Sequence, residues 1–365
     1  MQNPASPRTA RLINDRAAFD LLLAEGPLTR ARLRDLTGLS GPTVAELVAR
    51  LEAAGLIEPV GHHEERRRGP NAQLYGVIAA HRYAAGVDVS PERVSAAAVD
   101  LAGAVVGTAQ RDPAGEPHRV VLDAVRSALP GGLDRLAAVV VGVPGLVDPA
   151  TGDMAYAANL PGWSANVRSG VQAALPDTQV ILENEVNLAG VAEQRLGAAA
   201  GRDSFALLSL GAGIGVAVIL SGQVYRGASG GAGEAGYLPI GPGEFHDLAG
   251  GPALLELARE HGAGAQTDPA AAIAAADASL LPRLADRVAV GAAAICALLD
   301  PGLLVLGGDV GRAGGAELAG LVQARLTDRV PHRVTVTPAA APGNPVLQGA
   351  HLLGLDIARR AVLGD

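Results

Sequence analysis

The first eighty residues contain a group of side chains that donate hydrogen bonds to phosphates and to the edges of bases. Arginine guanidinium groups form paired hydrogen bonds with phosphate and with guanine, and hydroxyl groups donate to either partner. The donors that stand out are Arg30, Ser40, Thr43, Arg50 and the consecutive run Arg66, Arg67 and Arg68. Their concentration in one part of the chain predicts a contact with nucleic acid, provided that the local elements present them on one surface.

Three helices are expected around these donors. Apolar residues recur with helical spacing over residues 12–25, and Gly26-Pro27 ends that run. A second helix is expected over residues 28–37, followed by a tight turn at residues 38–40. A third helix, capped by Ser40 or Gly41, has apolar residues at i, i+3, i+4 and i+7 and ends near residues 54–55. Two helices joined by a short glycine-containing turn form a helix-turn-helix.

The segment after the third helix predicts the wing of a winged helix-turn-helix. Residues 56–60 and 73–77 have strand character, and the polar loop between them carries the three consecutive arginines. We expect the third helix to lie in the major groove and the arginines to contact phosphates or a narrow minor groove. Two alternatives remain open: arginines in a loop tip are often only solvated, and a three-helix head could instead bind a protein.

Composition excludes several classes of protein. The 365-residue chain is 49% hydrophobic and 18% charged, which is typical of a folded globular protein. The single cysteine, Cys296, excludes an intramolecular disulfide and a multi-cysteine zinc site. No apolar run is long enough to span a membrane and the first residues have no secretory-signal pattern, so we expect a cytoplasmic protein without a membrane partner.

The charge is unevenly distributed. Residues 1–80 hold 10 Arg and 9 Asp or Glu, a net charge of +1, whereas residues 81–365 hold 19 Arg and 28 Asp or Glu, a net charge of −9. A nearly neutral head in front of an acidic body places any contact with a polyanion in the head.

The body after residue 81 is expected to be α/β. Strands are expected at residues 83–89, 94–100, 137–143, 179–182, 205–210, 216–220 and 303–306, and helices at residues 187–196 and 285–299. Strands that alternate with helices favour two lobes around a cleft.

A series of motifs in the body resembles the ROK family, which includes repressors and sugar kinases. The matching stretches are Gly142–Asp148, Ala157–Trp163, Glu183–Asn187, Leu210–Gly215, Gly230–Gly236, Asp300-Pro301 and Leu306–Gly308. Their order and intervals follow the family over residues 83–355. The resemblance implies a two-lobed, actin-like sugar-kinase fold, and with the winged head in front the chain resembles a ROK repressor.

The resemblance also implies a sugar site made of amides and carboxylates. Asn159 and Glu234 match sugar-binding residues of the family, and Asn184 and Glu185 match an Asn-Asp pair whose Asp is the general base in the kinases. Tyr237 stands where the family has a His that binds zinc and touches sugar. These groups suit a polyol because each buried hydroxyl needs a partner. Without the family context, Asn159 suits a turn, Asn184 a helix cap and Glu234 a solvated loop.

Two departures from the family predict that the body is not an enzyme. The kinases present backbone amides to ATP from a D-x-G-G-T loop, but here Asp88 is followed by Val89-Ser90-Pro91-Glu92-Arg93. Pro91 has no amide hydrogen, Glu92 adds negative charge, and Glu185 is one methylene longer than the family's Asp. The zinc-binding cysteines are replaced by residues 245–251. We therefore expect no cofactor and no metal, and His246 and Glu256 have no assigned role.

Together these patterns predict a winged helix-turn-helix DNA-binding domain at residues 1–80 and a ROK domain at residues 81–365. The first lobe is expected at about residues 81–195 with a C-terminal helix at 345–363, and the second at about residues 196–344. The expected partners are operator DNA, a sugar or sugar-like effector, and further copies of the chain in a homodimer or higher homo-oligomer. The predicted function is a transcriptional regulator, a repressor, whose body senses a sugar without kinase activity. The alternatives are a ROK sugar kinase with an appended head, and a DNA-binding scaffold with no small-molecule ligand.

Overall fold

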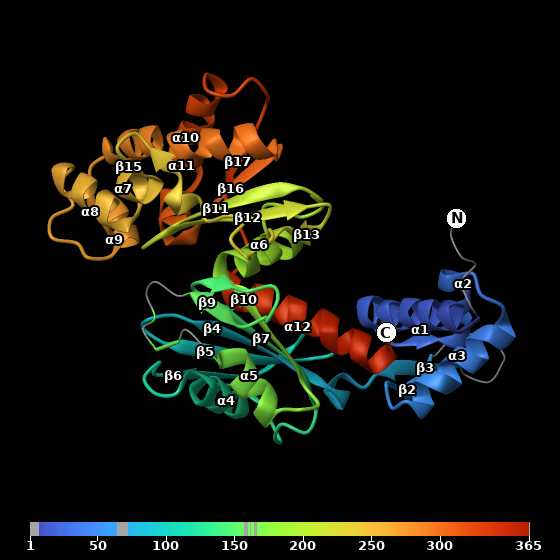
Figure 1. Cartoon of the computed structure of the whole chain (residues 1–365). Coiled ribbons are helices and arrows are strands. Elements are labelled where there is room, and N and C mark those ends of the chain that lie inside the picture. Colours follow the sequence, from blue (N-terminus) through green and yellow to red (C-terminus); the bar gives the residue numbers. More distant parts are fainter. Residues whose placement is uncertain (1–6, 64–71, 157–159, 161, 164–165, 365) are drawn as a thin grey trace.

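The computed structural model describes residues 7–63, 72–156, 160, 162–163 and 166–364. Figure 1 shows a small head at the N-terminal end, a first lobe beside it, and a second lobe on the far side of the first. The predicted fold class is confirmed: a winged helix-turn-helix precedes a two-lobed α/β body.

The head consists of three helices and a three-stranded antiparallel sheet. Its elements are α1 (Pro7–Glu25), β1 (Leu28–Thr29), α2 (Arg30–Thr37), α3 (Gly41–Ala53), β2 (Ile57–His63) and β3 (Ala72–Val77), with the strands in the order β1-β3-β2. The side-chain oxygens of Thr29 and Ser40 cap α2 and α3, and Gly38 ends α2 in the left-handed conformation. Two bounds differ from the sequence prediction. The first helix begins at Pro7, and residues 28–29 pair with β3 as a strand instead of opening the second helix.

The first lobe is a five-stranded sheet with helices on both faces. Its strands are β4 (Tyr83–Val89), β5 (Val94–Asp100), β6 (Val105–Arg111), β7 (Leu136–Val143) and β10 (Gln179–Asn184), in the order β10-β7-β4-β5-β6. The helices are α4 (Pro117–Ala128), α5 (Val167–Ala174), α6 (Glu185–Leu196) and α12 (Pro345–Leu363), and a short pair, β8 (Leu146–Val147) and β9 (Met154–Tyr156), follows β7. Strand side chains alternate between faces, so Val87 joins the core with α4 and α5, whereas Ala84 joins the core with α6 and α12.

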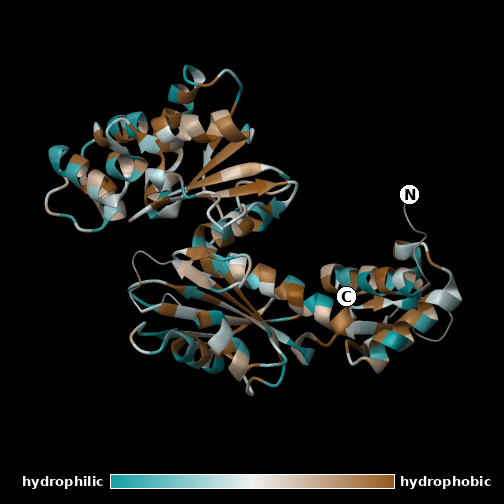
Figure 2. Cartoon of the chain, viewed as in Figure 1, coloured by the Kyte–Doolittle hydropathy of each residue, from teal (hydrophilic) through white to brown (hydrophobic). Residues whose placement is uncertain are grey.

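The second lobe is a five-stranded sheet covered by helices. Its strands are β11 (Phe205–Leu210), β12 (Ile214–Leu220), β13 (Gln223–Val224), β16 (Leu303–Gly307) and β17 (Thr335–Pro338), in the order β13-β12-β11-β16-β17. The other elements are η2 (Ala235–Tyr237), β14 (Pro239–Ile240), β15 (Gly243–Glu244), α7 (Phe245–Ala249), α8 (Gly251–Glu260), α9 (Pro269–Ala275), α10 (Leu280–Leu299) and α11 (Gly308–Thr327). Figure 2 shows the hydrophobic strands inside this lobe and more hydrophilic residues on the outer helices.

Two helices connect the parts of the molecule. α6 packs on α12 of the first lobe and on β12 of the second lobe, and α12 extends along the first sheet toward α1 of the head (Figure 1). Within the ranges that the structure describes, no helix is long and apolar enough to cross a membrane.

One buried carboxylate on α6 holds both places where the chain passes between the lobes. Glu193 is 1% exposed, and its Oε2 accepts the N–H of Ala198, just after α6, at 2.8 Å. Its Oε1 accepts the N–H groups of Ala340 and Ala341, just before α12, at 3.0 and 2.8 Å. The Arg312 guanidinium lies 3.7 Å from the same oxygen. Loss of these donors would leave a buried carboxylate without partners and strongly destabilise the fold. Glu193 therefore holds the two connecting segments, at residue 198 and at residues 340–341, in fixed positions relative to α6.

The head is joined to the first lobe by hydrogen-bonded backbone. After β3, the N–H of Ile78 donates to the carbonyl of Leu56, at the end of the α3–β2 turn, at 2.9 Å. The N–H of Leu101 donates to the carbonyl of Ala79 in η1 (Ala79–His81) at 3.0 Å. The guanidinium of Arg359 on α12 donates to the Leu101 carbonyl from both Nε and Nη2, at 3.0 and 2.8 Å. Hydrogen bonds and the short backbone segment of residues 78–79 therefore link the C-terminal part of α12 to Leu56, just after α3.

Candidate functional site

The N-terminal end of α3 presents hydroxyl groups at the surface of the head. Ser40 is exposed and its Oγ lies 2.8 Å from Oγ1 of Thr43, which is partly buried. Arg30 is exposed at the start of α2, with its guanidinium 5.2 Å from the centre of the Tyr75 ring and 3.9 Å from Glu52. Exposed cation–π and ion-pair contacts of this kind are weak, so Arg30 is available to a stronger acceptor such as phosphate.

Arg50, in the last turn of α3, is held within the head. Its Nη2 lies 2.6 Å from Oδ1 of Asp15 on α1, and its Nε donates to Oδ2 at 3.1 Å. This paired hydrogen bond raises the pKa of Arg50 and fixes α3 against α1. The predicted donors Arg66, Arg67 and Arg68 lie outside the described residues.

Asn184 is the N-cap of α6, and its side chain also reaches the first lobe's neighbouring strand. Its Oδ1 accepts the N–H groups of Val186 and Asn187 at 2.8 and 3.3 Å, and its Nδ2 donates to the Gly145 carbonyl, just after β7, at 3.0 Å. The amide is therefore fixed in orientation. Asn159 lies outside the described residues.

Glu185, the first residue of α6, lies among carboxylates from both lobes. Burial, together with the nearby negative charges of Asp88, Asp309 and Glu92, raises the pKa of Glu185 to about 7. Burial also raises the pKa of Asp88, whose Oδ2 accepts a hydrogen bond from Nδ2 of Asn344 at 2.6 Å. Asp88 and Glu92 come from the first lobe and Asp309 from α11 of the second. The negative charge of these carboxylates therefore disfavours the binding of phosphate groups in this region.

The turn between β4 and β5 uses its own amides. The N–H of Ser90 donates to the Arg93 carbonyl at 2.9 Å, and the N–H of Arg93 donates to Oγ of Ser90 at 3.3 Å. Pro91 has no N–H. The turn thus retains few donors for an ATP phosphate, whereas a phosphate-binding loop needs several free amides that converge on one point.

Glu234, Tyr237 and His246 form a second group of polar side chains, in the second lobe. Burial raises the pKa of Glu234, and the charge of nearby His246 opposes that shift. The Tyr237 and His246 rings meet edge to face, with their centres 5.8 Å apart. A Cβ on Gly236 would lie 2.1 Å from His246 Nε2, so only glycine lets this loop lie on the imidazole.

His246 is the residue that sequence reasoning left without a role. The β14–β15 hairpin separates it from Glu234 in the chain, and no spacing pattern pairs the two residues. The glycine at position 236 is the one local signal, because it indicates a close approach by another group without saying which.

The donor set of this region does not fit the zinc that the family resemblance implies. Zinc in proteins needs about four nitrogen, sulfur or carboxylate ligands at close range. Among the residues that the structure describes, no group of three or more His, Cys, Asp or Glu is arranged to hold a metal ion. Contacts among Gly236, Tyr237 and His246 hold the loop beside Glu234 instead.

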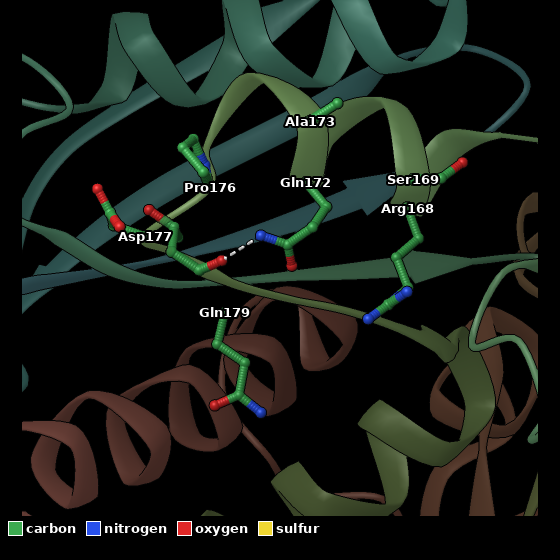
Figure 3. Close-up of a pocket in the computed structure, with 8 residues that line it drawn as sticks. Arg168, Ser169, Gln172, Ala173, Pro176, Asp177 and Gln179 are labelled. Carbon is green, nitrogen blue, oxygen red and sulfur yellow. Dashed lines mark hydrogen bonds between the residues drawn. The ribbon is translucent and has the colours of Figure 1, made fainter.

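Two surface pockets lie away from these residues. Figure 3 shows the first, with a volume of about 710 Å³, between α5 and the start of β10, where Nε2 of Gln172 donates to the Thr178 carbonyl at 2.9 Å. The second, about 400 Å³, lies between α1 and α12, at the contact of head and body. Neither is lined by a residue predicted to bind a ligand.

Replacing Glu185 with Gln is expected to stabilise the protein at pH 8 and to change its stability little at pH 5. Because the pKa of Glu185 is raised to about 7, folding favours the protonated carboxyl, and stability is lost as pH rises from about 4.5 towards 7. A neutral amide removes that loss, which is about 3 kcal/mol. Thermal unfolding at the two pH values checks this, with the exposed Glu260→Gln as control. An equal change at both pH values would contradict it.

The fold is similar to that of solved ROK proteins. A ROK family transcriptional regulator, a homolog of the E. coli MLC protein, has a TM-score of 0.73 and 18% identity, and the match covers 97% of this chain and 98% of that one. A ROK family glucokinase from Streptomyces griseus, solved with glucose and AMPPNP, has a TM-score of 0.61 and 24% identity, covering 75% of this chain and 99% of that one. At these identities the likeness shows the fold alone.

Curated relatives include both regulators and kinases. The xylose repressor of Bacillus subtilis (strain 168) is 27% identical over 236 residues, which are 62% of this chain and 60% of the repressor. The glucokinase of Halalkalibacterium halodurans is 25% identical over 280 residues, which are 66% of this chain and 84% of the kinase. The chain thus spans about three fifths of the length of the xylose repressor that it matches.

The family comparison divides the chain at the same place as the fold. Residues 17–69, in the head, match the MarR family, and residues 84–357, nearly the whole body, match the ROK family. The protein is a member of the ROK family that carries a MarR-type winged helix-turn-helix in front of its ROK domain.

Proposed function

We propose that this protein is a sequence-specific DNA-binding repressor whose ROK domain binds a sugar and does not phosphorylate it. The observation that carries the proposal is the joint at Leu101, where Arg359 of α12 and the backbone of Ala79 meet and connect the body to the head. Because the head is hydrogen-bonded to the sugar-kinase-like body, a change in the conformation of the body can change the position of the head and so its affinity for DNA. The likeness to the protein named xylose repressor supports this function.

On the DNA side, α3 is the proposed recognition helix. Ser40 and Thr43 at its exposed end would donate to base edges, and Arg30 and the wing residues Arg66, Arg67 and Arg68 would bind phosphates or the minor groove. Arg50 acts differently in this proposal: its pair with Asp15 sets the angle of α3. A homodimer, or a higher homo-oligomer, would place two heads on the two half-sites of an operator.

On the sugar side, the proposed contacts come from both lobes. Asn159, Asn184 and Glu185 would hold hydroxyl groups from the first lobe, and Glu234 and Tyr237 from the second. Amide and carboxylate side chains suit a neutral polyol because they donate to and accept from its hydroxyl groups. The carboxylates around Glu185 disfavour a phosphorylated ligand, because like charges would be brought together in a partly buried place.

The similarity to glucokinases makes sugar phosphorylation the second candidate function. The turn at residues 90–93 argues against it, because the amides of Ser90 and Arg93 bond within the turn and Glu92 adds negative charge close enough to raise the pKa of Glu185. We therefore propose that the protein is not an enzyme.

Changing Arg66, Arg67 and Arg68 together to Ala is expected to weaken operator binding and to flatten its dependence on salt. Each lost phosphate contact lowers the slope of log K against log salt by about 0.9. Fluorescence anisotropy at several salt concentrations measures both quantities. Arg259, Arg283 and Arg333, all exposed in the second lobe, provide the matched triple-alanine control. Unchanged affinity and slope in the wing variant would mean that the wing does not bind DNA.

A neutral sugar is expected to raise the melting temperature of the protein without being phosphorylated. A ligand that binds only the folded state stabilises it by about 2.7 kcal/mol at a hundred times its Kd. Thermal unfolding with xylose, glucose, other sugars and phosphosugars tests binding, and product assays with ATP test the kinase alternative. Phosphorylated product would establish the kinase. No shift with any sugar would favour a DNA-binding scaffold without a ligand.

A further inference from the structure

An ion pair between a buried carboxylate and a half-exposed guanidinium joins the two lobes beside the proposed sugar contacts. Glu183, near the end of β10 in the first lobe, is 3% exposed, and its Oε2 accepts a hydrogen bond from Nε of Arg226 at 2.7 Å. Its Oε1 accepts the N–H of Asn184 at 3.0 Å and Nδ2 of Asn187 at 2.9 Å. Arg226 follows β13 in the second lobe. The guanidinium is therefore the only cationic partner among the described contacts of this carboxylate.

Arg226 is also the first residue of a loop that leads to Glu234. The Arg226 carbonyl accepts the N–H of Ala232 at 3.1 Å, which closes the loop, and the Gly233 carbonyl accepts the N–H of Val216 at 2.8 Å. Within the loop, a Cβ on Gly230 would lie 2.1 Å from the carbonyl oxygen of Val147 in β8. The loop therefore starts in the second lobe, lies directly on the first, and returns to the second at Glu234.

The Glu183–Arg226 ion pair thus connects Asn184, on the first lobe, with the loop that ends at Glu234, on the second. Glu183 binds the backbone N–H of Asn184, and Arg226 begins the loop that ends at Glu234. A small shift of the Arg226 guanidinium would change the distance between Asn184 and Glu234, which are proposed to hold the same ligand. Misplacement of binding groups by about 1 Å can greatly reduce their effect.

We propose that the Glu183–Arg226 pair positions the two halves of the ligand site, with Asn184 and Glu185 on the first lobe and Glu234 on the second. Both residues are positioning residues and touch no ligand. The part of this proposal that concerns sugar affinity rests on the proposed function, whereas the ordering of residues 226–236 does not.

The test compares Arg226→Ala, Arg226→Lys and Glu183→Gln in the full-length protein. The control is Arg325→Ala, which removes an ion pair with Asp286 inside the second lobe. Hydrogen–deuterium exchange of the sugar-free protein is expected to rise in residues 227–236 of Arg226→Ala and Glu183→Gln and to stay unchanged in the control. The affinity for the sugar that binds best among xylose, glucose and other unphosphorylated sugars, measured by calorimetry, is expected to fall roughly tenfold or more in Arg226→Ala. Arg226→Lys, which keeps the charge, is expected to recover part of that loss.

Each outcome decides the matter. Unchanged exchange at residues 227–236 in folded Arg226→Ala overturns the proposal, as does a sugar affinity equal to that of the unmodified protein. A global rise in exchange in Arg226→Ala without recovery in Arg226→Lys would show that the pair stabilises the fold generally, and would overturn it too. If the unmodified protein binds no sugar while exchange rises only in this loop, the proposed function fails and the positioning of the loop stands.

Discussion

The relation between the two lobes depends on the carboxylate of Glu193, which accepts backbone hydrogen bonds from both segments that pass between them. A charge at 1% exposure is tolerated because three N–H groups and the Arg312 guanidinium surround it. These bonds fix both connecting segments to the same helix, α6. The Glu183–Arg226 pair lies at a second contact between the lobes.

The helix α12 connects the region between the lobes with the head. Its N-cap residue Asn344 binds Asp88, one of the carboxylates near Glu185, and Arg359 near its other end binds Leu101 at the joint with the head. One helix thus has its first turn at the proposed ligand site and its last turns at the DNA-binding part. A ligand changes DNA affinity through such a connection only if it binds one arrangement of the lobes better than the other.

Local signals in the sequence predicted the elements of the head and many strands of the body, but not the contacts between them. Ser40 and Gly38 mark the ends of α2 and α3 by their chemistry, and continuous apolar runs mark strands such as β7. The role of Arg50 as a DNA contact stays a prediction, and no local pattern in the sequence indicates that Asp15, 35 residues away, binds it. Asn184 matched a sugar contact by family and proves to be a helix cap as well, while the partnerships of Glu183 with Arg226 and of Glu234 with His246 arise only when distant segments fold together. At Pro91 the sequence departs from the kinase pattern, and the structure adds that the amides of Ser90 and Arg93 bond within the turn.

We propose that the protein binds both operator DNA and a sugar, and that the binding of each changes the affinity for the other. The direct measurement is the affinity for a selected operator fragment with and without saturating sugar, together with the affinity for that sugar with and without the fragment. The account predicts that both affinities change by the same factor, roughly fivefold or more, because linkage is reciprocal. Operator affinity that stays constant while the sugar site is demonstrably filled would contradict the account.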